Sequence, residues 1–147
     1  MRLFKTILAA LLMAFSLPLH AQDNEGLSDH GPLEIESYYQ IKWGYKDEFV
    51  ELYKRNHLPI LKALEAKGII EKIEIHYPIQ HIPGPGAWDV RVRITFRDPN
   101  VGMLGSDHTE WVRVQRELYP DRETFIEEEK RRFTLMKEHW DVAVYQE

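Results

Sequence analysis

Asn56 and His57 are the two adjacent residues of this chain whose types and position best suit chemistry. They follow Phe49 by seven and eight positions, so in a helix they lie on the apolar stripe that must face a sheet. An imidazole in such a place could act as a general base near neutral pH, beside a carboxamide that contacts a ligand. Alternatively, the pair is hydrogen-bonded and fixes a kink beside Pro59, because buried polar groups are costly without partners. His57 is thus the candidate catalytic residue.

Arg91 and Arg93 form a second candidate site. They alternate with apolar residues in the run Trp88–Phe96, so they share one face of a predicted strand. Neighbouring predicted strands bring further side chains to that face, namely Glu74, His76, Tyr38, Gln40 and Lys42. Guanidinium groups bind carboxylate or phosphate in a fork, which suggests an anion site. The alternative is a charged face neutralised by Glu74, Asp89 and Asp141 and packed inside a dimer.

Aromatic side chains supply a third possibility. Trp43, Tyr77, Trp88 and Trp111 fall on predicted inward faces. Together with Asn56 they could line a pocket for an aromatic ligand between helix and sheet. Such a stripe is more often simply core.

Metal and phosphate chemistry find no support in the spacing of the residues. His76 and His81 are five positions apart on a predicted strand, so they lie on opposite faces and cannot share a metal ion. The sequence has no glycine-rich phosphate loop, no nucleophile elbow and no zinc-ligand spacing. We predict neither a metal nor a cofactor.

Hydrophobic periodicity gives the elements that would position these residues. The expected strands are Ser37–Trp43, Ile69–Ile82, Trp88–Phe96 and Trp140–Gln146. The expected helices are Lys46–Lys67, with a kink near His57 and Leu58, then Asp107–Leu118 and Asp121–Glu138. In the last helix, Phe125, Phe133 and Met136 are expected to face inward. Its surface is expected to carry the ion pairs Glu127–Arg131 and Glu128–Arg132. The order β-α-β-β-α-β predicts a ferredoxin-like α+β sandwich with a four-stranded antiparallel sheet. Its second and fourth strands are edges, which suits Pro78 in the second.

Several short runs resemble the dimeric α/β-barrel superfamily. They are Tyr39-Gln-Ile-Lys-Trp-Gly, Asn56-His57-Leu58-Pro59, Gly68 and Trp88-Asp-Val-Arg-Val, and the resemblance covers Ser37 to Gln146. It implies a homodimer in which two sheets face each other and form a barrel with the helices outside. The superfamily includes cofactor-free monooxygenases, haem-degrading enzymes and stress proteins, so it does not select one function. Haem is an alternative cofactor through this resemblance, although no motif here assigns a histidine ligand.

The N-terminal segment predicts export. Arg2 and Lys5 precede an apolar stretch from Ile7 to Leu19, and Ala21 offers a small residue for cleavage. This pattern is typical of a secretory signal peptide at residues 1–21, followed by a flexible arm at 22–36 and one domain at 37–147. The expected location is therefore periplasmic or secreted, with no membrane anchor after cleavage. Because the chain has no cysteine, neither disulfides nor a lipid-bearing cysteine is possible.

Composition narrows the function further. The formal net charge of −5 argues against a general nucleic-acid surface. The leading expectation is a homodimer that binds a small aromatic or anionic molecule in a cavity between helix and sheet. The alternatives are an enzyme of the cofactor-independent monooxygenase or isomerase kind with His57 as base, and a structural homodimer that contacts another exported protein.

Overall fold

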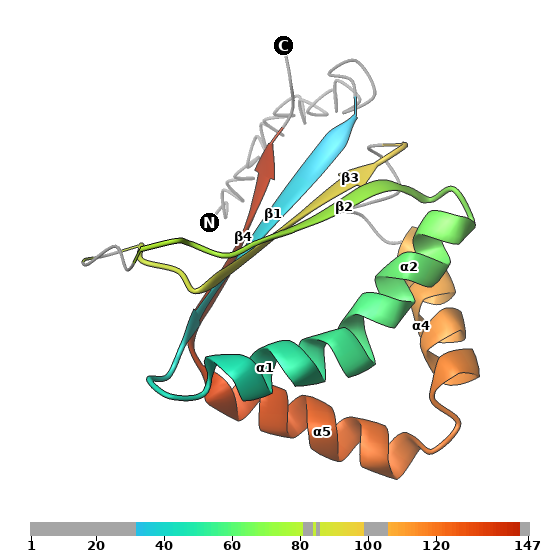
Figure 1. The fold of residues 1–147 in the computed structure, drawn as a ribbon. Coiled ribbons are helices and arrows are strands. Elements are labelled where there is room, and N and C mark those ends of the chain that lie inside the picture. Colours follow the sequence, from blue (N-terminus) through green and yellow to red (C-terminus); the bar gives the residue numbers. More distant parts are fainter. Residues whose placement is uncertain (1–31, 81–83, 85, 99–105, 145–147) are drawn as a thin grey trace, which may run out of the picture.

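The computed structural model describes residues 32–80, 84, 86–98 and 106–144. Its sheet contains β1 (Leu33–Ile41), β2 (Ile70–His76), β3 (Val90–Phe96) and β4 (Met136–Val144), in the order β2-β3-β1-β4 with every described pairing antiparallel. The described helices all lie on one side of this sheet (Figure 1). This arrangement confirms the predicted ferredoxin-like α+β sandwich, with β1 and β3 central and β2 and β4 at the edges.

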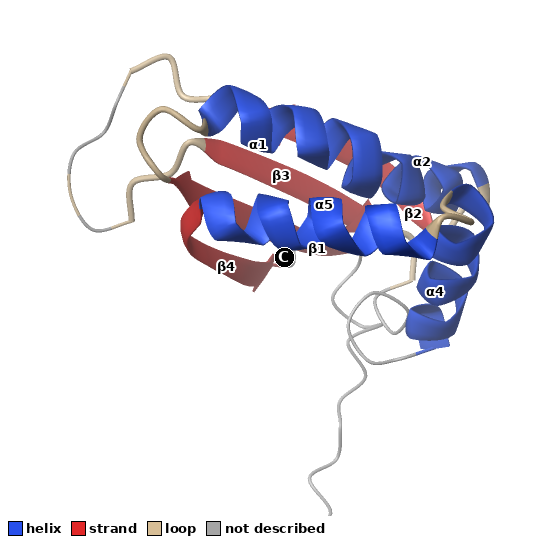
Figure 2. Cartoon of the chain, turned by 90° about the horizontal axis from the view of Figure 1, so that it is seen from below, coloured by secondary structure: helices blue, strands red, loops and turns tan. Residues whose placement is uncertain are grey.

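The helical layer has two parts. α1 (Lys46–Leu52), the π-helix η2 (Tyr53–His57) and α2 (Leu58–Ala66) follow one another, and α5 (Arg122–Leu135) lies beside them across the sheet (Figure 2). α4 (Ser106–Leu118) packs against α2 rather than on the sheet. The core between the layers includes the inward side chains of β3, which are Val90, Val92, Ile94 and Phe96. Their alternation is the one predicted from the sequence.

The interruption predicted near His57 exists, and its form is a π-helix. Pro59 has no N–H, so the carbonyl of Arg55 cannot receive the usual helical hydrogen bond. The N–H of Leu58 donates to the carbonyl of Tyr53, five residues back. The hydroxyl of Tyr119, from the end of the α4 region, donates to the Arg55 carbonyl at 2.7 Å. Tyr119 therefore supplies the hydrogen bond that Pro59 removes.

All four strands have boundaries that differ from the predictions, and β4 begins at Met136 instead of Trp140. β1 begins at Leu33, so residues 33–36 of the predicted arm belong to the sheet, and it ends at Ile41 instead of Trp43. β2 ends at His76, which leaves Pro78 outside the strand. β3 begins at Val90, after Trp88. The predicted strands were too long at the end of β1, the end of β2 and the start of β3, and too short at the starts of β1 and β4. Turns at strand ends carry no periodic signal that would mark these boundaries.

The last helix is shorter than predicted and faces differently. It ends at Leu135, and Met136 already belongs to β4. Phe125 is buried as predicted, but Phe133 is 54% exposed, and Leu135 and Arg132 are buried instead. The predicted pairs Glu127–Arg131 and Glu128–Arg132 are also wrong, because Arg131 binds Glu48 and Arg132 binds Glu129.

The predicted signal peptide, the arm up to residue 31, His81 and the side chain of His108 lie outside what the structure describes. Within the described residues, no helix is both long and apolar enough to cross a membrane. Gly68 ends the first helical run as predicted: its φ of +74° is a conformation that side chains with a Cβ rarely adopt.

Candidate functional site

The predicted pair Asn56 and His57 lies in η2, between the helices and the sheet. Asn56 is buried, at 1% exposure, and it approaches Glu128 of α5, whose pKa it lowers more than any other neighbour does. The Nδ2 atom of Asn56 nevertheless makes no hydrogen bond of normal geometry with the described residues. Arg55 also binds Glu128, at 2.6 Å. Asn56 thus lies at the contact between η2 and α5, and whether the pair has a structural or a chemical role stays a prediction.

His57 is packed between aromatic rings. Its ring centroid lies 4.9 Å from that of Tyr53 and 5.1 Å from that of Trp111. Burial, followed by the charge of Arg132, lowers the pKa of His57 to about 3. An imidazole with this pKa stays neutral near pH 7 but is a weak proton acceptor, because a general base works best with a pKa near the working pH. The catalytic role of His57 stays a prediction, to which this geometry adds no support.

The aromatic residues predicted to line a pocket with Asn56 are dispersed. Trp43 lies past the end of β1 and is 88% exposed, and Tyr77 lies past the end of β2 and is 41% exposed. Trp88 lies before β3 and contacts Tyr38 and Arg91 on the side of the sheet away from the helices. A hollow of about 290 Å³ includes Trp43 and Asp89, but neither Asn56 nor His57 lines it. The structure therefore does not gather these residues into one helix–sheet cavity.

The predicted arginines, Arg91 and Arg93, lie on the side of the sheet away from the described helices. Cross-strand pairing arranges its side chains in three rows, each of which crosses all four strands. We name them the His76 row (His76, Arg91, Tyr38, Trp140), the Glu74 row (Glu74, Arg93, Glu36, Val142) and the Lys72 row (Lys72, Thr95, Glu34, Val144). Together they form the open face. The predicted neighbours of Arg91 and Arg93, His76 and Glu74, are their direct partners on β2, and Gln40 lies on β1 beyond Tyr38.

Glu36 is the centre of an ion-pair network on the open face. Arg93 donates to Glu36 Oε1 through Nε at 2.9 Å and Nη2 at 2.6 Å, and the hydroxyl of Tyr38 donates to Oε2. The Tyr38 hydrogen bond is the main cause that lowers the pKa of Glu36, and Arg93 adds to it. Glu36 is only 8% exposed although no described helix covers it. Asp89 and Asp141 were predicted to neutralise the arginines. Instead, Asp89 accepts a hydrogen bond from the N–H of Ile41, and Asp141 approaches His139.

The His76 row is less completely paired. Arg91 Nη1 lies 3.7 Å from Glu36 Oε1, a long ion pair, and its Nε has no hydrogen-bond partner among the described residues. His76 Nε2 is likewise buried without such a partner. The guanidinium carbon of Arg91 stands 5.6 Å from the centroid of the Trp88 ring, and Tyr38 stacks on Trp140 at 5.3 Å. Cations and aromatic rings thus meet at this end of the face.

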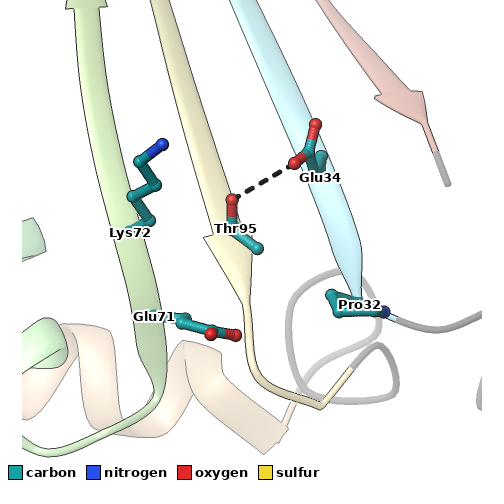
Figure 3. A pocket seen from close by; sticks show the side chains of 5 residues that line it. All are labelled: Pro32, Glu34, Glu71, Lys72 and Thr95. Atoms are coloured by element: carbon teal, nitrogen blue, oxygen red, sulfur yellow. Dashed lines mark hydrogen bonds between the residues drawn. The ribbon is translucent and has the colours of Figure 1, made fainter. Parts of the chain in front are cut away.

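A hollow lies at the other end of the open face. The register of β2 against β3 shifts between Ile70 and Lys72, so that Glu71 is an extra residue and its side chain joins that of Lys72 on one side. The hollow has a volume of about 340 Å³ (Figure 3). The side chains around it are Pro32, Glu34, Glu71, Lys72 and Thr95. Thr95 Oγ1 is 3.5 Å from Glu34, and Lys72 pairs with Glu74 at 3.0 Å.

Sequence reasoning missed Glu34 and Glu36, because it placed them in the arm. The alternation of Leu33, Ser37, Tyr39 and Ile41 on the buried side runs through this segment and would have extended the strand. It also missed Glu71, since no periodic pattern marks a bulge. No group of three or more His, Cys, Asp or Glu side chains suited to a metal ion occurs within the described ranges.

Comparisons with known proteins show the fold. The chain is similar to a dimeric ferredoxin-like protein from an uncultured marine organism, with 9% identity and a TM-score of 0.51 over 82% of this chain and 93% of the other. It also matches a NIPSNAP family protein from Agrobacterium tumefaciens, with 12% identity and a TM-score of 0.44 over 80% of this chain and 88% of the other. No protein-family model and no curated protein matches the sequence.

Proposed function

We propose that the protein is an exported homodimer that binds a small anionic or aromatic molecule between the open faces of its two subunits. One observation carries this proposal: the open face combines a half-buried network around Glu36 with apolar side chains on β4, of which Val142 is 40% exposed. A sheet face exposed only to water usually carries polar side chains at such positions on its edge strand. The Glu36 network and the apolar edge instead suit a face that is covered in the assembled protein.

The charges of the open face also suit a second copy of the same chain. Its three rows carry three carboxylates, on Glu34, Glu36 and Glu74, and three permanent cations, on Lys72, Arg91 and Arg93, and Glu71 beside Lys72 adds a fourth carboxylate. A twofold axis brings such a face against itself, and charges of both signs on it limit net repulsion. The marine neighbour is itself described as dimeric. These points support pairing through the sheet, the arrangement that the barrel resemblance also implies.

Sedimentation equilibrium tests the pairing. We expect the wild-type protein to be a dimer at micromolar concentration and Val142→Lys to be a monomer with unchanged circular dichroism, because a charge would enter an apolar contact. Ile126→Lys is the matched control: Ile126 is 42% exposed on α5, and its substitution should leave the dimer intact. A monomeric wild type, or equal effects of the two lysines, would contradict the proposal.

Native mass spectrometry tests ligand binding and export together. Protein purified from the periplasm of its own host should begin at Gln22, as cleavage after Ala21 requires. It should also retain a small molecule that leaves when the protein is unfolded. An intact N-terminus in the cytoplasmic fraction would refute export, and a ligand-free dimer that takes up none of a library of small acids would refute binding.

A further inference from the structure

We infer that the His76 row is a subsite for the carboxylate of an aromatic acid, with Arg91 as the residue that binds the carboxylate. This inference rests on the proposed homodimeric binding protein and names the chemistry of its ligand. The row meets the two requirements of such a ligand, a guanidinium group with unused hydrogen-bonding capacity and aromatic surfaces beside it.

Arg91 has unused hydrogen-bond donors because the carboxylates near it bind other residues. Glu36 is the carboxylate closest to it, but Oε1 of Glu36 accepts two hydrogen bonds from Arg93 and Oε2 accepts one from Tyr38. Glu74 pairs with Lys72. Arg91 is left with one carboxylate contact of 3.7 Å, beyond hydrogen-bond length, and with the Tyr38 hydroxyl, whose pKa it acts to lower; its side chain is 25% exposed. A carboxylate would be bound by the planar fork of guanidinium donors.

The covered atoms define how the ligand must approach. Nε of Arg91 is not accessible, so the first contact falls on the Nη atoms, which form the outer part of the side chain. His76, the direct cross-strand partner of Arg91, holds a second buried nitrogen without a partner. Buried polar atoms without hydrogen bonds are costly. A small rotation of Arg91 toward a bound carboxylate would give its Nε a partner and reduce that cost.

Aromatic rings flank the same guanidinium. Trp88 lies 5.6 Å from it, and the rings of Trp88 and Tyr38 meet edge to face at 6.1 Å. Tyr38 in turn stacks on Trp140. These rings offer faces and edges to a planar ligand, which favours an aromatic over an aliphatic acid. In the proposed dimer, the partner's open face would close this space and exclude water, which strengthens the charge interaction.

Isothermal titration calorimetry with benzoate tests the subsite, with benzamide and acetate as probes that lack the charge and the ring. We expect wild-type protein to bind benzoate at least about tenfold more tightly than either probe. Arg91→Gln should weaken benzoate binding by about tenfold or more, the usual cost of losing a charged hydrogen bond. Lys72→Gln, which removes the same charge from the other end of the face, should change binding less than about twofold.

A tryptophan pair supplies a second, independent control. Trp88→Ala should weaken benzoate binding, and Trp43→Ala should not, because Trp43 lies past the end of β1, is not a member of the row and is 88% exposed. No benzoate binding by the wild type at millimolar concentration overturns the inference. Equal loss with Arg91→Gln and Lys72→Gln also overturns it, since that would show a general effect of charge.

Sedimentation of the same samples separates this inference from the proposed function. Arg91→Gln that stays dimeric and loses benzoate supports both. A wild type that is dimeric and retains another small molecule, yet ignores benzoate, overturns the subsite and leaves the proposed function standing. A monomeric wild type overturns the enclosed space on which both depend.

Discussion

Arg132 shows how one residue joins the helical layer. It is 3% exposed, binds Glu129 through Nε at 3.0 Å and Nη2 at 2.7 Å, and lies against the rings of Phe49 and Tyr53. A buried charge is tolerated only when paired, and removal of one partner leaves the other unpaired. Sequence analysis placed Arg132 on the surface, because an arginine beside acidic residues on a helix reads as a solvated pair. Only the packing of α5 against α1 reveals its burial.

Arg132→Ala should therefore destabilise the protein strongly. We expect a loss of about 3 kcal/mol in the free energy of unfolding, within the range for breaking a buried ion pair. Arg131→Ala is the matched control, since its pair with Glu48 is exposed and should contribute little. Urea denaturation of both variants measures the difference. Similar midpoints for the two variants would show that Arg132 is not the structural cation that its burial indicates.

His57 predicts a dependence of stability on pH. Its folded pKa of about 3 lies below its ordinary value of 6.5, so the unfolded chain binds a proton first as the pH falls. The stability contributed by neutral His57 is present above pH 6.5 and declines from there toward pH 3, by at most about 1.4 kcal/mol per pH unit for one proton. His57→Phe should remove this part of the slope in urea denaturation measured across that range. Parallel curves for both proteins would refute it.

At the scale of elements, the π-helix was predictable in place but not in form. Pro59 signals an interruption from the sequence alone, whereas the hydrogen bond to the freed Arg55 carbonyl comes from Tyr119, which is 64 residues away in the chain. The central and edge strands were predictable because alternation is a local signal and the element order sets the topology, whereas Pro78, which supported the edge assignment, lies outside β2. The helix–sheet pocket was not, since Trp43 and Trp88 lie just outside β1 and β3, where the alternation of a strand no longer assigns a face, and Trp111 lies in α4.

Tyr119→Phe tests the role of the tyrosine at η2. Loss of its hydroxyl leaves the Arg55 carbonyl without that hydrogen bond, and we expect a loss of about 1 kcal/mol in the free energy of unfolding. Hydrogen exchange should become faster at the amides of η2 and the first turn of α2. Tyr45→Phe, at an exposed tyrosine before α1, is the control and should change neither. Faster exchange throughout the protein would instead indicate global destabilisation.

At the scale of the whole molecule, the fold divides its two faces between two tasks. The helix side holds the apolar core and the buried polar residues of η2, which tie the helices together. The open face holds paired charges, stacked aromatic rings and an apolar edge. The sequence predicted the arginines of this face and their β2 partners, but it missed Glu36, on which the network depends, because β1 begins earlier than expected. Only the register of all four strands shows that these charged, aromatic and apolar side chains lie together on the open face.

Pairing of the open faces should make the Tm depend on protein concentration, by mass action. A dimer that unfolds to separate chains is stabilised by its own concentration, so the Tm of the wild type should rise as the protein concentration rises from about 1 to 100 μM. Val142→Lys should have a lower Tm that does not depend on concentration, because its unfolding no longer separates two chains. Ile126→Lys should keep the concentration dependence of the wild type. Differential scanning calorimetry of the three proteins makes the comparison, and a wild-type Tm independent of concentration would mean that the open face is not covered by a second copy.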